Sequence, residues 1–175
     1  MPFRITPDID NYDGLTPKDI RPFRTLNGTR RAETWVPVTV EWDPATTPAH
    51  RGKAVDFPAL GGLGYVFSER ALELLFPLIG DKIEALPLDS RKGKYYVVNV
   101  LNLIDALDES RSDIKRISGG RIDVIVKHVF IPGATEGQHI FKLKQEPLGP
   151  VYVSPQFKKA VEDNRLDGLL LLEVG

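Results

Sequence analysis

The sequence contains no cysteine, one methionine and only three histidines among its 175 residues. The absence of cysteine excludes disulfides, thiolate metal sites and cysteine nucleophiles, and nothing points to an oxidising compartment. No apolar run approaches the roughly 20 residues of a membrane span, and the first residues lack the apolar core of a signal peptide. We therefore expect a cytoplasmic protein that does not enter a membrane.

The sequence also lacks an excess of charge of either sign. It has 23 basic and 24 acidic residues, a formal net charge of −1, so the strongest electrostatic argument for nucleic-acid binding is missing. Three short basic clusters remain, at Arg30-Arg31, at residues 91–94 and at Lys115-Arg116. A regulatory or nucleic-acid-binding domain stays an alternative, but it requires these clusters to converge on one face. Otherwise they are solvated turns.

The composition is that of an ordinary globular protein, with 42% hydrophobic and 27% charged residues. A single domain of this length buries roughly 70% of its unfolded surface. Half of the 14 prolines lie before residue 55, which predicts a loop-rich arm over residues 1–54, packed on a domain of residues 55–175. Alternation from Val36 to Trp42 predicts one strand in the arm, which Pro37 confines to an edge or a strand start.

A weak internal repeat organises the rest of the chain. Residues 64–69 and 150–155 each read as a strand that ends at a serine, Ser68 or Ser154, followed by a helical pattern and a second strand. Each serine can cap the amides of the first helical turn. The unit reflects either a duplication or two uses of a common strand-helix-strand arrangement.

The two helices are predicted to bury one face each against a sheet. Apolar residues recur at helical spacing in both: Ala71, Leu74, Leu75, Leu78 and Ile79 in the first, and Phe157, Ala160 and Val161 in the second. Pro77 predicts that the first helix ends near Phe76 or kinks there, and Gly80 marks its latest stop.

Four further segments complete the predicted fold. Residues 95–100, 124–131 and 140–143 read as strands, whereas Leu101–Leu107 is either a strand extension or a turn of helix. We therefore predict an α+β fold (mixed α/β), with a mixed β-sheet, a few short helices, two strand-helix-strand units and a proline-rich N-terminal arm.

No motif predicts catalytic residues, a metal or a cofactor. The acidic segment from Asp8 to Gly14 fails the register of a calcium loop, and residues 61–64 precede a strand, whereas phosphate-binding glycine loops precede a helix. The histidines lack metal-pair spacing. A small enzyme with an unfamiliar site remains a second alternative. It would require convergence in a pocket of some of His128, His139, Asp105 and Glu136.

Six short elements occur together, in order, across residues 54–174. They are Asp56-Phe57-Pro58, Val66-Phe67-Ser68-Glu69-Arg70, Tyr95-Tyr96-Val97-Val98-Asn99-Val100, Asp105-Ala106-Leu107-Asp108, Ile140-Phe141-Lys142-Leu143 and Val151-Tyr152-Val153-Ser154 through Phe157. In this the sequence resembles an immunity protein family of bacterial polymorphic-toxin systems, typified by a myxobacterial member and formerly a domain of unknown function.

The resemblance implies a non-enzymatic inhibitor that binds a cognate protein toxin, often a nuclease or another secreted effector in such systems, and occludes it. It carries over no catalytic residues and leaves the toxin-facing surface undefined. For that surface we select the acidic connection that contains Asp105, Asp108, Glu109 and Asp113. Carboxylates there would complement a toxin that binds nucleic acid and would speed encounter by steering.

Overall fold

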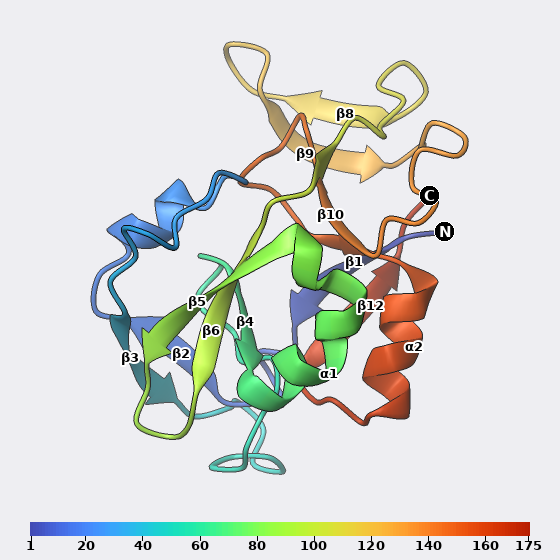
Figure 1. Ribbon diagram of the computed structural model, residues 1–175. Helices are drawn as coiled ribbons and strands as arrows, with labels where there is room; N and C mark the ends of the chain where they lie inside the picture. The colour runs from blue at the N-terminus through green and yellow to red at the C-terminus, as the bar shows by residue number, and fades with distance from the viewer.

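The computed structural model describes residues 1–175 and confirms an α+β fold (Figure 1). Two five-stranded sheets are accompanied by a two-stranded hairpin and two α-helices. No helix combines the length and the apolar character needed to cross a bilayer. The first sheet has the order β12-β1-β11-β10-β7 and comprises β1 (Phe3–Pro7), β7 (Leu103–Ile104), β10 (Ile140–Leu143), β11 (Tyr152–Val153) and β12 (Leu169–Glu173).

The second sheet has the order β2-β3-β5-β6-β4. Its members are β2 (Gly14–Pro17), β3 (Val38–Asp43), β4 (Tyr65–Ser68), β5 (Ile83–Asp89) and β6 (Tyr95–Val100). The hairpin consists of β8 (Asp113–Arg116) and β9 (Ile122–Lys127). The helical segments are α1 (Glu69–Ile79), α2 (Pro155–Asp163) and the 3-10 turns η1 (Arg21–Thr25) and η2 (Gly80–Lys82).

The first 54 residues supply strands to both sheets. β1 lies between β11 and β12 in the first sheet, while β2 and β3 form one side of the second. The alternation in the sequence predicted only β3, which begins directly after Pro37, at a strand start as expected. β1 and β2 were not predicted, because each is short and each carries a proline at its end.

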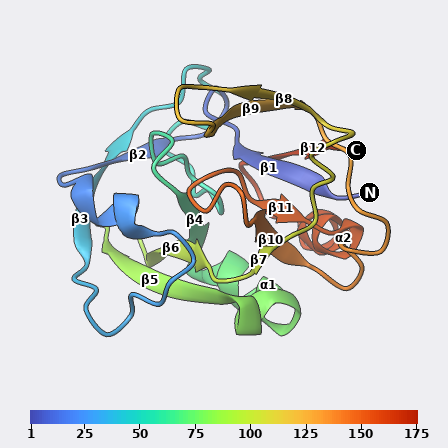
Figure 2. The same ribbon diagram turned by 90° about the horizontal axis from the view of Figure 1, so that it is seen from above.

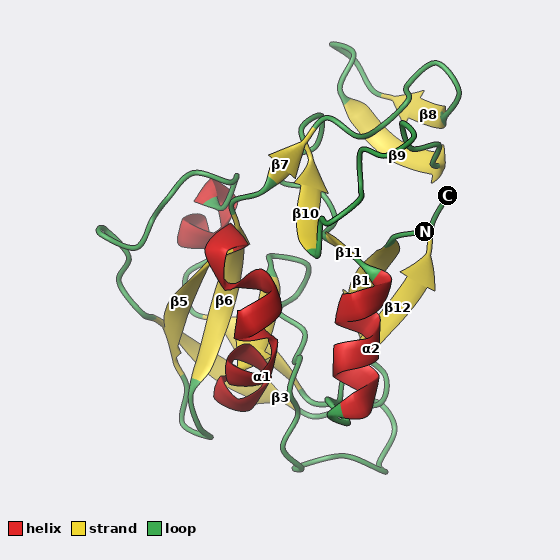
Figure 3. Ribbon diagram, turned by 45° about the vertical axis from the view of Figure 1, so that its right-hand side comes forward, coloured by secondary structure: helices red, strands yellow, loops and turns green.

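Both serine caps predicted from the sequence are present. The Ser68 hydroxyl accepts a hydrogen bond from the Ala71 amide at 3.0 Å, and the Ser154 hydroxyl accepts one from the Phe157 amide at 3.1 Å. Each cap satisfies an amide that has no partner within the helix. The two capped helices lie side by side (Figure 3).

Of the two outcomes predicted at Pro77, an end of α1 near Phe76 is wrong, since the helix continues through Pro77 to Ile79. The latest stop predicted at Gly80 is confirmed, because Gly80 is the C-cap. Proline at this position leaves the carbonyl of Glu73, four residues earlier, without its helical hydrogen bond. Both residues are exposed, so water can reach that side of the helix. Leu74 is also exposed, which narrows the predicted buried face to Ala71, Leu75 and Ile79.

Two of the six short elements that carry the family resemblance meet at Asp56, which is buried. Its carboxylate accepts hydrogen bonds from the Ser68 hydroxyl at 2.7 Å and the Asp167 amide at 3.0 Å, and it forms an ion pair with Arg70 at 3.0 Å. A charged group buried in this way is stable only because its acceptors are satisfied. Asp56 therefore fixes the start of α1 against the turn before β12.

Candidate functional site

The β8–β9 hairpin projects away from both five-stranded sheets (Figures 1 and 3). Its two strands pair only with each other, so both outer edges carry free backbone groups. The register shifts twice, between Asp113 and Ile114 and between Lys115 and Arg116. Such irregularities increase the local twist and hinder edge-to-edge pairing with a second hairpin.

One side of the hairpin is anchored in a core cluster beneath it. Ile125 is buried, and Ile114 and Ile122 pack against the same cluster, which includes Phe141 and Tyr152 of the first sheet. This contact holds the projecting strands in a fixed position relative to the rest of the protein. An isolated two-stranded hairpin would be marginally stable without it.

Other apolar side chains of this region remain exposed. Val126 is 55% exposed, and Ile117, Val124 and Ile131 each leave at least two fifths of their surface in water. The sequence pattern predicted a strand over residues 124–131, whereas β9 runs from Ile122 to Lys127 and stops before His128. The β-branched residues of β9 were the sequence pattern that indicated a strand here. β8 has no such pattern, because Ile114 is its only apolar residue.

Three of the four predicted acidic residues belong to this hairpin and the loop that precedes it. The Asp108 carboxylate holds the turn that follows it, because it accepts hydrogen bonds from the Ser110 hydroxyl at 2.7 Å and from the amides of Ser110 and Arg111. These hydrogen bonds, those from Ser110 foremost, lower the pKa of Asp108. Asp105 lies before the bridge between Leu107 and Phe130 and accepts a hydrogen bond from Gln145 instead.

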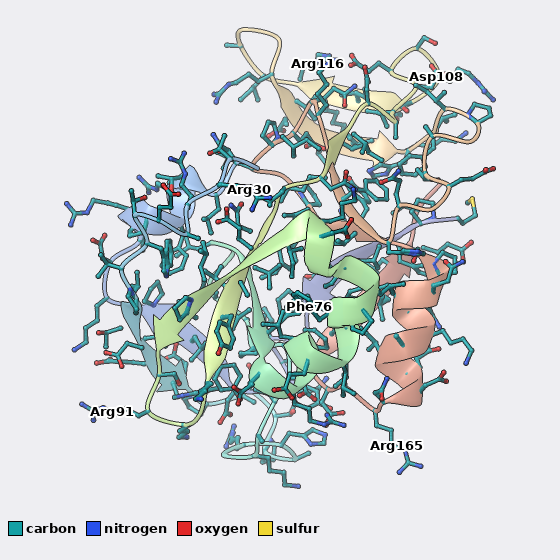
Figure 4. The ribbon with its side chains drawn as sticks, in the orientation of Figure 1. Arg30, Phe76, Arg91, Asp108, Arg116 and Arg165 are labelled. Atoms are coloured by element: carbon teal, nitrogen blue, oxygen red, sulfur yellow. The ribbon has the colours of Figure 1, made fainter.

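The carboxylates of the hairpin have basic neighbours. Glu109 forms an ion pair with Arg116 at 2.7 Å, and Asp113 stands opposite Lys127 in the strand register. Asp108 and Arg116 both lie at the projecting end of the molecule (Figure 4). Residues 105–127 contain five acidic and five basic side chains, so this surface carries charges of both signs and no net charge.

The residues considered for an enzymatic site make separate contacts. None of His128, His139, Asp105 and Glu136 lines the cavity of about 770 Å³ that the protein contains. His128 Nε2 lies 2.9 Å from the Tyr152 hydroxyl, and His139 Nδ1 lies 2.9 Å from that of Ser154. No group of three or more His, Asp or Glu side chains is arranged to hold a metal ion.

The three basic clusters do not converge on one face. Arg116 lies at the projecting end, Arg91 at the opposite end of the molecule and Arg30 between them (Figure 4). Arg30 is 3.9 Å from the buried Glu84, and Lys94 is 3.6 Å from Glu69, so parts of the clusters serve local ion pairs. The arrangement does not meet the requirement set above for nucleic-acid binding.

The fold and this surface define a small α+β protein whose most exposed element is an anchored β-hairpin with mixed apolar and charged side chains. The family model described as immunity protein family (Imm11) matches residues 82–175, which is more than half of the chain. The chain belongs to this immunity protein family. The match begins just before β5 and includes the hairpin and every strand of the first sheet except β1. No match was found among curated proteins.

Proposed function

We propose that this protein binds a cognate bacterial toxin in the cytoplasm of the cell that produces it and neutralises the toxin by occluding its active site or an essential surface. Membership of the immunity protein family supports a toxin as the partner. The observation that carries the choice of surface is the β8–β9 hairpin, which lies within the matched residues and exposes Val124 and Val126 beside charged side chains.

The hairpin has the chemistry of a preformed protein interface. Exposed apolar groups supply the binding energy of such interfaces, and charged groups at the rim supply specificity. Anchoring through Ile125 means that little conformational entropy is lost on binding. A stable complex buries about 1,600 Å² in total, so the toxin would also contact neighbouring loops, including that of Asp108 and Glu109.

We further propose that Asp105, Asp108, Glu109 and Asp113 face a basic toxin surface, such as that of a nuclease. The Glu109 carboxylate accepts a hydrogen bond from the Arg116 guanidinium at 2.7 Å. A toxin arginine would offer the same donor group. Since basic residues of the hairpin balance these carboxylates, the complex depends more on close contact than on long-range steering. Binding should therefore weaken only modestly when salt is raised.

The test is co-expression of this protein with the toxic product of the neighbouring gene, followed by isolation of the complex. Two hairpin variants, Val126→Asp and Asp113→Lys, are expected to weaken toxin binding at least tenfold and to lose rescue of growth. Leu170→Asp on β12 and Glu73→Lys on α1 are matched controls, since both positions are exposed and lie outside the hairpin. Thermal melting of each variant establishes that it is folded.

The outcomes separate the function from the surface. The absence of both a complex and rescue for the wild-type protein would overturn the toxin-binding proposal. A wild-type complex that persists in both hairpin variants but is lost in a control variant would retain the function and reject the hairpin as its surface.

A further inference from the structure

A cavity of about 770 Å³ lies between the two five-stranded sheets, on residues that the proposed function does not use. β1 and β10 of the first sheet and β2, β4 and β6 of the second sheet contribute to its lining. Figure 2 shows where these strands lie. Leu15, Phe23 and Leu26 are buried and apolar, while Ile9 and Leu148 remain 65% and 63% exposed. A partly open, mainly apolar cavity of this size is typical of a small-molecule site.

Lys142 is a buried cation in the lining of this cavity. It interrupts the apolar strand β10, whose other members Ile140, Phe141 and Leu143 are almost completely buried, and it is itself only 8% exposed. Its Nζ donates to the Pro147 carbonyl at 3.1 Å and, more weakly, to the Leu26 carbonyl at 3.4 Å. No carboxylate lies within ion-pair distance of it, although buried charges in proteins are ordinarily paired.

The ammonium group has capacity for a further partner. Lysine carries three donor hydrogens, and two of them are directed to carbonyls. Burial lowers the pKa of Lys142 to about 8, which still leaves the group mostly protonated at neutral pH. The protein thus maintains a positive charge at the cavity wall at a cost in stability, without an internal counter-ion.

A second donor lies in the same lining. The Tyr65 hydroxyl accepts a hydrogen bond from the Val151 amide at 3.3 Å, so its own hydrogen is free to be donated. Burial raises the pKa of Tyr65 and keeps the hydroxyl neutral. The charged side chains that also line the cavity are Arg24 and Asp43, and the Asp43 carboxylate already accepts a hydrogen bond from Thr16. The lining therefore has one more positive charge than negative.

We propose that this cavity binds a small amphiphilic acid, a molecule with an apolar body and a single carboxylate. The carboxylate forms an ion pair with Lys142 and accepts a hydrogen bond from the Tyr65 hydroxyl, while the apolar body packs against the side chains of Leu15 and Phe23. Gly61 and Gly62 form part of the lining with left-handed backbone and open space where a Cβ would stand, so they leave the approach unobstructed. The acid is a ligand of the free protein and is independent of the toxin.

Isothermal titration of the purified protein with octanoate tests the proposal, with 1-octanol as the neutral molecule of the same length. We expect one octanoate per chain, bound at least tenfold more tightly than octanol, since a charge-assisted hydrogen bond to a buried cation contributes about one to two powers of ten. Lys142→Met should reduce octanoate affinity at least tenfold. Lys144→Met is the control, because Lys144 is exposed and two positions away.

A second measurement uses the wild-type protein alone and does not depend on the folding of a variant. Octanoate should protect Lys142, but not Lys144, from modification by an amine-reactive reagent read out by peptide mass. Failure of millimolar octanoate to bind would overturn the proposal. Equal affinity for octanoate and octanol would overturn it too, as would equal losses in the two methionine variants. None of these results bears on toxin binding, which is measured without octanoate.

Discussion

The Tyr152 hydroxyl lies 2.9 Å from Nε2 of His128, and this hydrogen bond joins β11 of the first sheet to the residue that follows β9. The two rings also contact each other edge to face, with centroids 5.5 Å apart. His128 is buried, so the base of the projecting hairpin is held by a polar contact as well as by Ile125.

The burial of His128 predicts that the stability of the protein depends on pH. Burial lowers the pKa of His128 below the ordinary value of 6.5, so below pH 6.5 the unfolded chain takes up a proton that the folded chain does not. Above pH 6.5 neither state binds this proton, so His128 does not reduce the free energy of unfolding. As the pH falls towards the folded-state pKa, proton uptake by the unfolded chain lowers that free energy. Urea denaturation at pH 7.5 and 5.5 should show this decline in the wild-type protein and a smaller one in His128→Gln. A decline of equal size in both proteins would contradict the assignment.

The two helix caps should differ in their contribution to stability. Ser154→Ala removes a cap and a hydrogen bond to His139, whose ring is partly exposed so that water can replace the contact, and it should cost about 1 kcal/mol. Ser68→Ala also removes the hydrogen bond to the buried Asp56 carboxylate, and we expect a loss of about 2 to 3 kcal/mol. Chemical denaturation measures both values. Equal losses would indicate that Asp56 is satisfied without the Ser68 hydroxyl.

Neighbouring leucines of α1 should differ in how much stability the protein loses when each is truncated. Leu75 is completely buried in the largest core cluster, and Leu75→Ala should cost about 2 to 5 kcal/mol through lost burial and the cavity left behind. Leu74 is 41% exposed, so Leu74→Ala should cost less than about 1 kcal/mol. Denaturant titration measures the free energy of unfolding of both variants. A larger loss for Leu74→Ala than for Leu75→Ala would contradict the assignment of the buried face.

Lys142→Met should stabilise the folded protein at neutral pH. The pKa of about 8 lies below the ordinary 10.5, so below pH 8 the folded state bears the full cost of a buried ammonium, up to about 3 kcal/mol. Between pH 8 and 10.5 the folded lysine loses its proton before the unfolded one, and the advantage of methionine should shrink. Unfolding free energies of both proteins at pH 7 and 10 test this, and a variant that is less stable at pH 7 would contradict it.

Elements that depend on interactions between neighbouring residues were predictable from the sequence, whereas elements that depend on distant partners were not. The caps at Ser68 and Ser154 were predictable because a serine and the three residues after it contain the whole interaction. β1 was not predictable, because its partners β11 and β12 lie almost the whole chain away. Leu101–Leu107 resolved as the short strand β7, whose pairing with β10 likewise depends on a distant segment.

The same distinction applies to the sites. The sequence placed Asp108, Glu109 and Asp113 on one connection, but their basic partners follow from the loop geometry and the strand register. Lys142 appeared only as one residue of a predicted strand. Its burial depends on Leu26 and Pro147, which reach it through tertiary structure, so no local pattern could have indicated a cation at a cavity wall.

The pairing of β1 with β12 has a consequence for biosynthesis. Phe3 aligns with Glu173 in the register, so β1 is translated well before β12 and cannot pair with it until the segments between them have been made. Loop closure over such a separation is slow, and the first sheet should be the last part of the protein to form on the ribosome. Under the function proposed above, this delay would favour making the protein ahead of the toxin that it binds.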